Sequence, residues 1–447
     1  MVLSSLISTR SHRKFPFTLA EVARGSLLAL AASALACSGT ESPAPAGSGG
    51  AVSVGGSGNG GAPVGSGGTT SLGPTGGTNN GNPTGGNNAA PTGGRAPTGG
   101  NPATGGSNVG VGGAATGGKA TGGAATGGTT STGATTGPCD IYAAASPATP
   151  CVAAYSTTRL LRAAYTGPLY QVRKGGTVQD IMAVGGFADG ASQDTFCGTS
   201  ACTVSILYDQ STKGNNLKVA PAGCYTGTAS EADYESNAKG KTVQISGHKV
   251  YALYMIAHDG YRNNTPSGMP TGSAAQGIYE IADGARTPLG SACCWDFGNA
   301  STNNCNQGTM NAMYFGTGYW GKGAGSGPWF LADLEGGVWA GGTGASTVVN
   351  PNLPSSKIPF AFGILKTSTS NYVIRVGDAT SGTLTTGNNS GLPKTLNSPG
   401  GIILGIGGDN SNSSLGTFFE GAITAGQPSD ATDALVLANV QAAKYGQ

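Results

Sequence analysis

The sequence from Pro138 to Gln447 predicts an all-β domain built as an antiparallel sandwich. Short runs with alternating apolar and polar residues recur along this segment, as expected for strands that bury one face. The clearest runs are residues 203–208, 249–256, 360–365 and 372–376. Clusters of Gly, Asn, Pro and Ser separate them, for example at 213–216 and 386–391, which is typical of hairpin connections and not of βαβ units.

Three further elements are expected in the same segment. Residues 417–424 resemble the late strand of a concanavalin-like jelly roll, where an aromatic-x-Gly-x-Ile run crosses the sheet. Short helices are expected at 157–164 and at 430–443, where apolar residues recur on one helical face. The fold predicted for residues 138–447 is therefore one concanavalin-like β-sandwich, a size that all-β domains often reach without dividing.

Residues 1–37 have the layout of a secretory signal. Basic residues precede the apolar stretch 26–36, which is shorter than the about 20 apolar residues of a membrane-spanning helix. The stretch ends at Cys37 and resembles a bacterial lipoprotein signal, in which the cysteine carries the lipid. Leu35 lies one place later than usual, so ordinary cleavage near Ala36 is the alternative. Both predict export, either as a lipoprotein of the bacterial cell surface or outer membrane, or as a secreted protein.

Residues 38–137 are predicted to be a disordered tether. They contain 35 glycines in 100 positions, no aromatic residue, and the triplet Thr-Gly-Gly eight times. Such a composition cannot bury enough apolar surface to offset the conformational entropy lost on folding. Any membrane attachment is expected only through the lipid on Cys37.

Charge and histidine content exclude several classes of function. Residues 138–447 contain 17 basic and 19 acidic residues, a net charge of −2, with no basic run. Nucleic acid is therefore not an expected partner. His248 and His258 are too isolated for a metal site or a catalytic triad, and no metal or cofactor is expected.

Two carboxylates interrupt the apolar run 328–337. If this run is a strand, its period-two alternation places Trp329, Asp333 and Glu335 on one face. An aromatic ring beside paired carboxylates suits a sugar-cleaving site, since such a site needs a platform, a nucleophile and a polar anchor. A surface ion pair or an acidic rim of the sheet is the alternative.

The domain contains eight cysteines, an even number that predicts disulfides in an exported protein. Proximity in sequence favours two pairs, Cys139–Cys151 and Cys197–Cys202. The other four are Cys224, Cys293, Cys294 and Cys305. Spacing alone favours joining each of the adjacent cysteines to a distant partner, because bridges between neighbours are rare. A direct bridge between neighbours is the alternative.

Several long motifs then occur in order between Pro138 and Gly446. They are Pro138-Cys-Asp-Ile-Tyr142, Pro150-Cys-Val-Ala-Ala154, Gly167-Pro-Leu-Tyr-Gln171, Tyr208-Asp-Gln-Ser211, Gly260-Tyr-Arg-Asn-Asn264, Ala292-Cys-Cys-Trp-Asp296, Gly405-Ile-Gly-Gly-Asp-Asn-Ser-Asn412 and Ala442-Ala-Lys-Tyr445. Together they resemble the catalytic domain of glycoside hydrolase family 54, the arabinofuranosidase B type.

This resemblance implies a β-sandwich that removes terminal α-L-arabinofuranosyl groups with retention of configuration. The expected substrates are arabinose-containing plant polysaccharides or oligosaccharides such as arabinoxylan and arabinan, and a monomer is expected. The family's Ala-Asp-Leu/Met-Glu motif makes Glu335 the nucleophile and Asp333 a ligand of sugar hydroxyls. The Gly-Gly-Asp-Asn-Ser-Asn motif makes Asp409 the general acid/base, with Gly408 beside it.

Other features are also implied by the resemblance alone. Cys293–Cys294 would form a vicinal disulfide against the sugar, and Trp320 would be a wall of the same pocket. Gly336-Gly337 depart from the family, because fungal relatives have Asn residues there, so a side-chain contact to substrate is lost or supplied elsewhere. The pair Cys224–Cys305 would be an added bridge.

Two alternatives remain at this point. A catalytically inactive, lectin-like module would bind sugar without cleaving it. A purely structural surface protein is the second alternative, and it would leave the matched acids without a role. For the segment Asp409-Asn-Ser-Asn412 by itself, the alternative is an oxygen-rich calcium loop of lectin type, although the segment contains a single carboxylate.

Overall fold

The computed structural model describes residues 136–224, 230–286, 293–305, 308–318 and 320–447. The predicted signal at 1–37 lies outside this part of the chain, as does the predicted linker at 38–137 except for its last two residues. Three helices lie within the described residues, α1 (Pro138–Ala144), α2 (Gly190–Cys197) and α3 (Asp430–Ala442). None of the described helices is both long and apolar enough to cross a bilayer.

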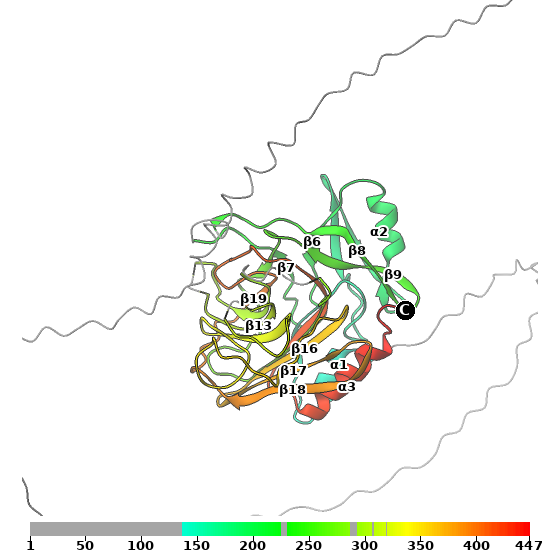
Figure 1. Cartoon of the computed structure of the whole chain (residues 1–447). Coiled ribbons are helices and arrows are strands. Elements are labelled where there is room, and N and C mark those ends of the chain that lie inside the picture. The colour runs from blue at the N-terminus through cyan, green and yellow to red at the C-terminus, as the bar shows by residue number, and fades with distance from the viewer. Residues whose placement is uncertain (1–135, 225–229, 287–292, 306–307, 319) are drawn as a thin grey trace, which may run out of the picture. The chain divides into compact units, whose positions relative to one another are not determined.

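Antiparallel strands form two layers. The back layer has the order β1-β20-β11-β16-β17-β18. Its strands are β1 (Cys151–Ser156), β20 (Gly416–Ala425), β11 (Gln276–Ala282), β16 (Ala361–Thr367), β17 (Asn371–Asp378) and β18 (Ser381–Gly391). Helix α3 packs against α1 and β18 (Figure 1).

The front layer has the order β10-β19-β12-β13-β14-β15. Its strands are β10 (Tyr261–Asn263), β19 (Gly401–Leu404), β12 (Asp296–Ala300), β13 (Met310–Gly316), β14 (Trp329–Leu334) and β15 (Val338–Trp339). Further strands continue the hydrogen bonding from β10 through β7 and β6, and from β20 through β9 and β8. These four strands are β6 (Thr203–Leu207), β7 (Leu217–Val219), β8 (Asn237–Ile245) and β9 (His248–Met255). Strand β2 (Tyr170–Lys174) pairs with β6 and with β3 (Thr177–Ile181). Strands β4 (Ala183–Val184) and β5 (Phe187–Ala188) pair separately.

The hydrophobic core lies between the two layers. Phe330 of β14 packs over Gly363 of β16 so closely that a Cβ at that glycine would lie 2.4 Å from the ring. Phe297 of β12 meets Phe418 of β20 with ring centroids 5.5 Å apart. Because core residues from both layers interdigitate, the predicted β-sandwich is confirmed.

Most predicted elements have a counterpart in the structure. The five predicted strands correspond to β6, β9, β16, β17 and β20, and the predicted C-terminal helix to α3. The helix predicted at 157–164 is wrong, because this segment contains no helix. The hydroxyl of Ser156 accepts the backbone N–H groups of Thr158 and Arg159, so a local turn replaces the helical hydrogen bonds.

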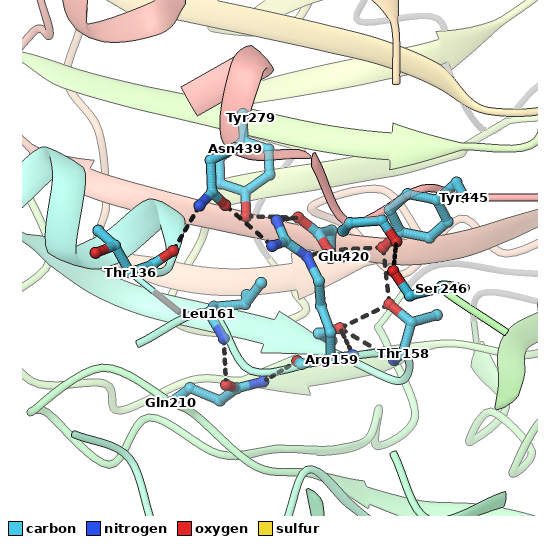
Figure 2. A network of polar contacts seen from close by, with 12 residues as sticks. Thr136, Thr158, Arg159, Leu161, Gln210, Ser246, Tyr279, Glu420, Asn439 and Tyr445 are labelled. Carbon is cyan, nitrogen blue, oxygen red and sulfur yellow. Dashed lines mark hydrogen bonds and ion pairs between the residues drawn. The ribbon is translucent and has the colours of Figure 1, made fainter. Parts of the chain in front are cut away.

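Figure 2 shows why this segment is held in an irregular conformation. Arg159 forms a bidentate ion pair with Glu420 of β20, with Nε–Oε2 and Nη2–Oε1 distances of 2.6 and 2.7 Å. Tyr445 donates its hydroxyl to the same carboxylate, and Tyr445 and Thr158 share a further hydrogen bond. The N-terminal segment and the C-terminal end of the domain are thus joined through one buried carboxylate.

Candidate active site

The candidate site is built on one face of the front layer. Direct register partners run across five strands from Arg262 through Ile403, Gly298 and Ala312 to Asp333. Side chains of directly paired residues point to the same face of a sheet. Arg262 on β10 and Asp333 on β14 therefore lie on one face, with a floor of small and apolar residues between them.

Asp333 is a buried acid on this floor. Its side chain is 2 % exposed, and its Oδ1 atom has no hydrogen-bond partner among the described residues. Burial raises the pKa of this carboxyl well above its usual range, and the negative charges of Asp409 and Glu335 raise it further. Asp409 and Glu335 are thus both close enough to Asp333 for their charges to act on it.

Glu335 does not lie on the strand, as the period-two pattern predicted. Strand β14 ends at Leu334, and the N–H of Leu334 donates to the carbonyl of Gly337 over 2.8 Å. Glu335 and Gly336 form the two-residue hairpin turn between β14 and β15, with φ of 49° and 83°. Hairpin turns of this length favour positive φ at both positions, which a glutamate rarely adopts.

The carboxylate of Glu335 is half-buried and has a defined partner. Its Oε1 accepts the backbone N–H of Asn397 over 2.8 Å, and Lys394 Nζ lies 3.4 Å from its backbone carbonyl oxygen. Burial raises the pKa of Glu335, while the Asn397 hydrogen bond and the positive charge of Lys394 lower it. The net result is a raised pKa for Glu335, and these two contacts keep the rise smaller than burial alone would make it.

Asp409 lies in the turn that follows β19. It is 7 % exposed, and its Oδ1 accepts the backbone N–H of Ser411 over 2.9 Å and the hydroxyl of the same serine. The preceding residue, Gly408, donates its N–H toward Met310 Sδ at 3.1 Å, and its carbonyl accepts from Arg262. This geometry gives Asp409 only one carboxylate oxygen without a local donor, which is unlike a calcium-binding loop.

Cys293 and Cys294 form a vicinal disulfide next to the Asp409 turn, across a cis peptide bond. The carbonyl of Cys293 accepts from the N–H and the hydroxyl of Ser413 over 3.0 and 2.8 Å. A Cβ at Gly407 would lie 3.3 Å from the sulfur of Cys294 and 3.1 Å from Asp409 Oδ1. The disulfide and the carboxyl of Asp409 therefore share one neighbourhood.

The other predicted site residues are placed as follows. Gly336 is exposed, with open space around its Cα, whereas a Cβ at Gly337 would lie 2.4 Å from the ring of Trp339. Trp320 is half-buried and packs against the hydrophobic core.

The other six cysteines of the domain pair with one another, and none of them bonds to Cys293 or Cys294. The pairs are Cys139–Cys151, Cys197–Cys202 and Cys224–Cys305, with Cα–Cα distances of 5.4, 5.6 and 4.6 Å. The distant pairing that spacing alone favoured for Cys293 and Cys294 is therefore wrong. Among the described residues, no group of three His, Cys, Asp or Glu side chains could hold a metal ion.

Sequence reasoning missed two further acids. Asp296 is fully buried on β12, and neither of its carboxylate oxygens has a hydrogen-bond partner in the described part of the chain. Burial raises the pKa of Asp296 well above its usual range, and the charges of Asp333, Glu280 and Asp409 raise it further. Glu280 is also fully buried and accepts from Trp295 Nε1 over 3.0 Å. The only sequence signal was that Asp296 ends the Ala292-Cys-Cys-Trp-Asp296 motif.

The chain is similar to known arabinofuranosidases over its described domain. The family model for the catalytic domain of α-L-arabinofuranosidase B matches residues 138–446. The α-L-arabinofuranosidase B of Aspergillus oryzae is 46% identical over 322 residues, which cover 69% of this chain and 62% of the relative. An arabinofuranosidase/β-xylosidase of Trichoderma koningii is 45% identical over 321 residues, covering 69% and 63%. This chain therefore spans less than two thirds of the length of these relatives.

Solved structures give the same picture. An arabinofuranosidase complexed with arabinofuranosyl-α-1,2-xylobiose matches with a TM-score of 0.65 and 41% identity, covering 69% of this chain and 66% of that one. A glycoside hydrolase family 54 α-L-arabinofuranosidase soaked with a cyclic sulfate inhibitor matches with the same TM-score, 42% identity and the same coverage.

Proposed function

We propose, on the premise that the chain belongs to the α-L-arabinofuranosidase B catalytic-domain family, that it is an exported, monomeric, retaining α-L-arabinofuranosidase. It would remove terminal arabinofuranosyl groups from arabinoxylan or arabinan. The observation that carries the proposal is that Asp333 on the floor of the front layer lies close to Glu335 in the turn after β14 and to Asp409 in the turn after β19. The complex of the related enzyme with arabinofuranosyl-xylobiose supports the choice of substrate.

In this proposal the reaction proceeds by double displacement. Glu335 attacks the anomeric carbon and forms a covalent arabinosyl ester, while Asp409 donates its proton to the departing glycosidic oxygen. Asp409, now a carboxylate, then takes a proton from water, and the resulting nucleophile breaks the ester and releases arabinose. Two inversions at the anomeric carbon give net retention.

The surroundings of each acid support its proposed role. Glu335 has a backbone donor and a nearby lysine, which favour the ionised state that a nucleophile requires. Asp333 Oδ1 has no hydrogen-bond partner among the described residues, so this carboxyl has unused capacity to bind a sugar hydroxyl. The vicinal disulfide beside Asp409 and the half-buried Trp320 would supply apolar walls.

A lectin-like module is the weaker alternative. The related chains are named as arabinofuranosidases, and the Asp409 turn does not present the ligand set of a calcium-dependent lectin. A purely sugar-binding role would also leave the strained turn at Glu335 without a use.

Export is supported by the four disulfides, since such bonds persist in oxidising compartments. The reported relatives are fungal, so they give no support to a bacterial lipid anchor on Cys37. We therefore propose export alone, with residues 38–137 as a spacer.

The deciding experiment measures arabinose release by the full chain from an aryl α-L-arabinofuranoside and from arabinoxylan. The wild type should hydrolyse both, and Glu335→Ala should hydrolyse neither. Asp409→Ala should lose about 10²–10⁴-fold on substrates with poor leaving groups, the usual contribution of general acid catalysis.

Azide separates the two roles. Added azide should restore turnover of the activated aryl substrate by Asp409→Ala and give an arabinosyl azide of retained configuration. Rescue of the Glu335 variant should give the inverted azide. Binding of arabinosides without any hydrolysis by the wild type would favour the lectin-like alternative.

A further inference from the structure

We propose that Arg262 is a positioning residue for the acid/base carboxyl of Asp409. The inference rests on the proposed function and goes beyond it, because it assigns a role to a buried cation on a different strand. Arg262 is 4 % exposed and lies on β10, at one end of the row of register partners that ends at Asp333.

The guanidinium of Arg262 holds two loops that border the site. Its Nη1 donates to the carbonyl of Gly408 over 2.9 Å, and its Nη2 donates to the carbonyl of Ser301 over 2.7 Å. Its Nε donates to Asn264 Oδ1 over 2.5 Å. These three hydrogen bonds end on uncharged oxygens and use the planar fork of the guanidinium, which lysine could not reproduce.

The bond to Gly408 fixes the peptide plane that precedes Asp409. On the other side of the same glycine, the N–H points to Met310 Sδ, and a Cβ would lie 2.9 Å from Met310 Cγ. Gly408 is thus held from both sides, and the position of the Asp409 backbone follows from it. A misplacement of about 1 Å at a catalytic group costs roughly 10²-fold in rate.

The positive charge of Arg262 has a second effect. None of the ion pairs within the described residues includes Arg262, so its charge is not cancelled by a contacting carboxylate. Its charge nevertheless interacts with Asp409 and with Asp233. A nearby cation favours the ionised form of an acid. Arg262 therefore stabilises the Asp409 carboxylate that remains after the proton has been donated.

Other charged groups oppose this effect. Asp333 on β14 and Asp296 on β12 both interact electrostatically with Asp409. When ionised, Asp333 and Asp296 repel the Asp409 carboxylate. Among these groups Arg262 is the only cation, so its charge opposes their repulsion of the Asp409 carboxylate.

The test compares full-length Arg262→Gln and Arg262→Lys with the wild type on a series of aryl α-L-arabinofuranosides with increasingly poor leaving groups. Both should lose at least about tenfold more kcat/KM on the poorest leaving group than on the 4-nitrophenyl compound. The alkaline limb of the kcat/KM profile should move to higher pH in Arg262→Gln, because a positive charge close to the proposed acid/base carboxyl is lost. Arg262→Lys should keep the position of that limb, since it keeps the charge.

Arg375→Gln is a matched control. Arg375 is also buried, but it contacts the Asp430 carbonyl and the Asp433 carboxylate of α3 over 3.1 and 3.0 Å. Its loss should lower the melting temperature and leave the leaving-group dependence and the pH profile as in the wild type. In an Asp409→Ala background, Arg262→Gln should cause no further loss on poor leaving groups, because the group through which it acts is absent.

Several outcomes would overturn the inference. An equal loss on all substrates with an unmoved alkaline limb would show that Arg262 serves only the fold, as would failure of both variants to fold. Additive losses in the double variant would show that it does not act through Asp409. The activity of the wild type is measured before that of any variant. If the wild type cleaved no arabinofuranoside, the proposed function itself would fail.

Discussion

At the residue scale, Glu335 shows how the site uses backbone strain. Glu335 has a φ of 49°, in the left-handed region of the backbone. This conformation costs a residue with a Cβ atom about 1–2 kcal/mol relative to the right-handed one. The neighbouring Gly336 takes the second positive φ at no steric cost. The turn advances Glu335 beyond the end of β14, toward the N–H of Asn397. Strain of this kind persists where surrounding structure enforces it, typically at functional sites.

The strain at Glu335 can be measured with a matched pair of variants. Glu335→Ala and Glu335→Gly both lose the hydrogen bond to Asn397, but only glycine relieves the positive φ. Glu335→Gly should therefore be more stable than Glu335→Ala by about 1 kcal/mol in the free energy of unfolding. Urea unfolding at one pH checks this difference. Equal stabilities would show that the turn is not strained, whatever the activity of the variants.

Glu280 provides a second prediction at the residue scale. Burial raises the pKa of Glu280 to about 8, partly offset by the hydrogen bond from Trp295. The unfolded chain has a glutamate pKa of about 4.3. Because the folded pKa is raised, the stabilising contribution of the neutral acid is fully present below about pH 4.3. It is lost as the pH rises toward 8.

Glu280→Gln should therefore reduce the loss of stability between pH 5 and pH 8. Each pKa unit corresponds to about 1.4 kcal/mol, so the effect should reach a few kcal/mol. The amide can still accept from Trp295. Asp296 and Asp333 shift in the same direction, so the slope should fall without vanishing. The free energy of unfolding is measured at several pH values for variant and wild type. An equal dependence on pH in the two proteins would contradict the raised pKa of Glu280.

At the element scale, two connecting segments beside β12 bring the chemistry together. The turn after β19 carries Asp409, and the segment before β12 carries the vicinal cysteines. Ser413 joins the two by donating twice to the Cys293 carbonyl. Within the turn, Ser411 donates to the Asp409 carboxylate, and from outside it Arg262 holds the carbonyl of Gly408.

The vicinal disulfide should therefore matter more for binding than for folding. Closing so small a ring constrains little of the unfolded chain, so replacing Cys293 and Cys294 by alanine should lower the melting temperature only slightly. KM for arabinofuranosides should rise, because an apolar wall beside Asp409 is removed. Cys139→Ala with Cys151→Ala is the contrasting control, with a larger effect on stability than on KM.

Mass spectrometry of an unreduced digest provides the direct check on the bond. It should find both cysteines in one peptide with an internal bridge. A linkage of either cysteine to Cys224 or Cys305 would contradict the pairing described here.

At the scale of the whole molecule, local pattern predicted the strands better than it predicted the site. Alternation and turn residues located β6, β9, β16, β17 and β20, because the residues that a strand buries recur at every second position of its own sequence. The helix expected at 157–164 failed because its conformation is decided by Glu420, more than 250 residues away. The residues around 157–164 give no indication that Arg159 will pair with Glu420.

The site itself required the register of five strands. Asp296 and Arg262 each lie in a family motif, but neither motif gives them a role, and each becomes significant only through strands that pair in space. Asp333 and Glu335 were noticed because acids are rare in this chain. Their assigned roles, with that of Asp409, came from family motifs and remain proposals.

The last prediction concerns residues 38–137 and the domain together. This segment is rich in glycine and has no aromatic residue, so its composition offers no packing groups to the sandwich. Deleting it from the full chain should leave kcat/KM on a small aryl arabinofuranoside unchanged and should not shift the melting temperature of the domain. If the segment serves as a spacer, the deletion should instead slow release of arabinose from insoluble arabinoxylan, where reach matters. A replacement of equal length made of Gly and Ser should restore that rate. A lower melting temperature after deletion would show that the segment contributes to the folded structure, against its composition.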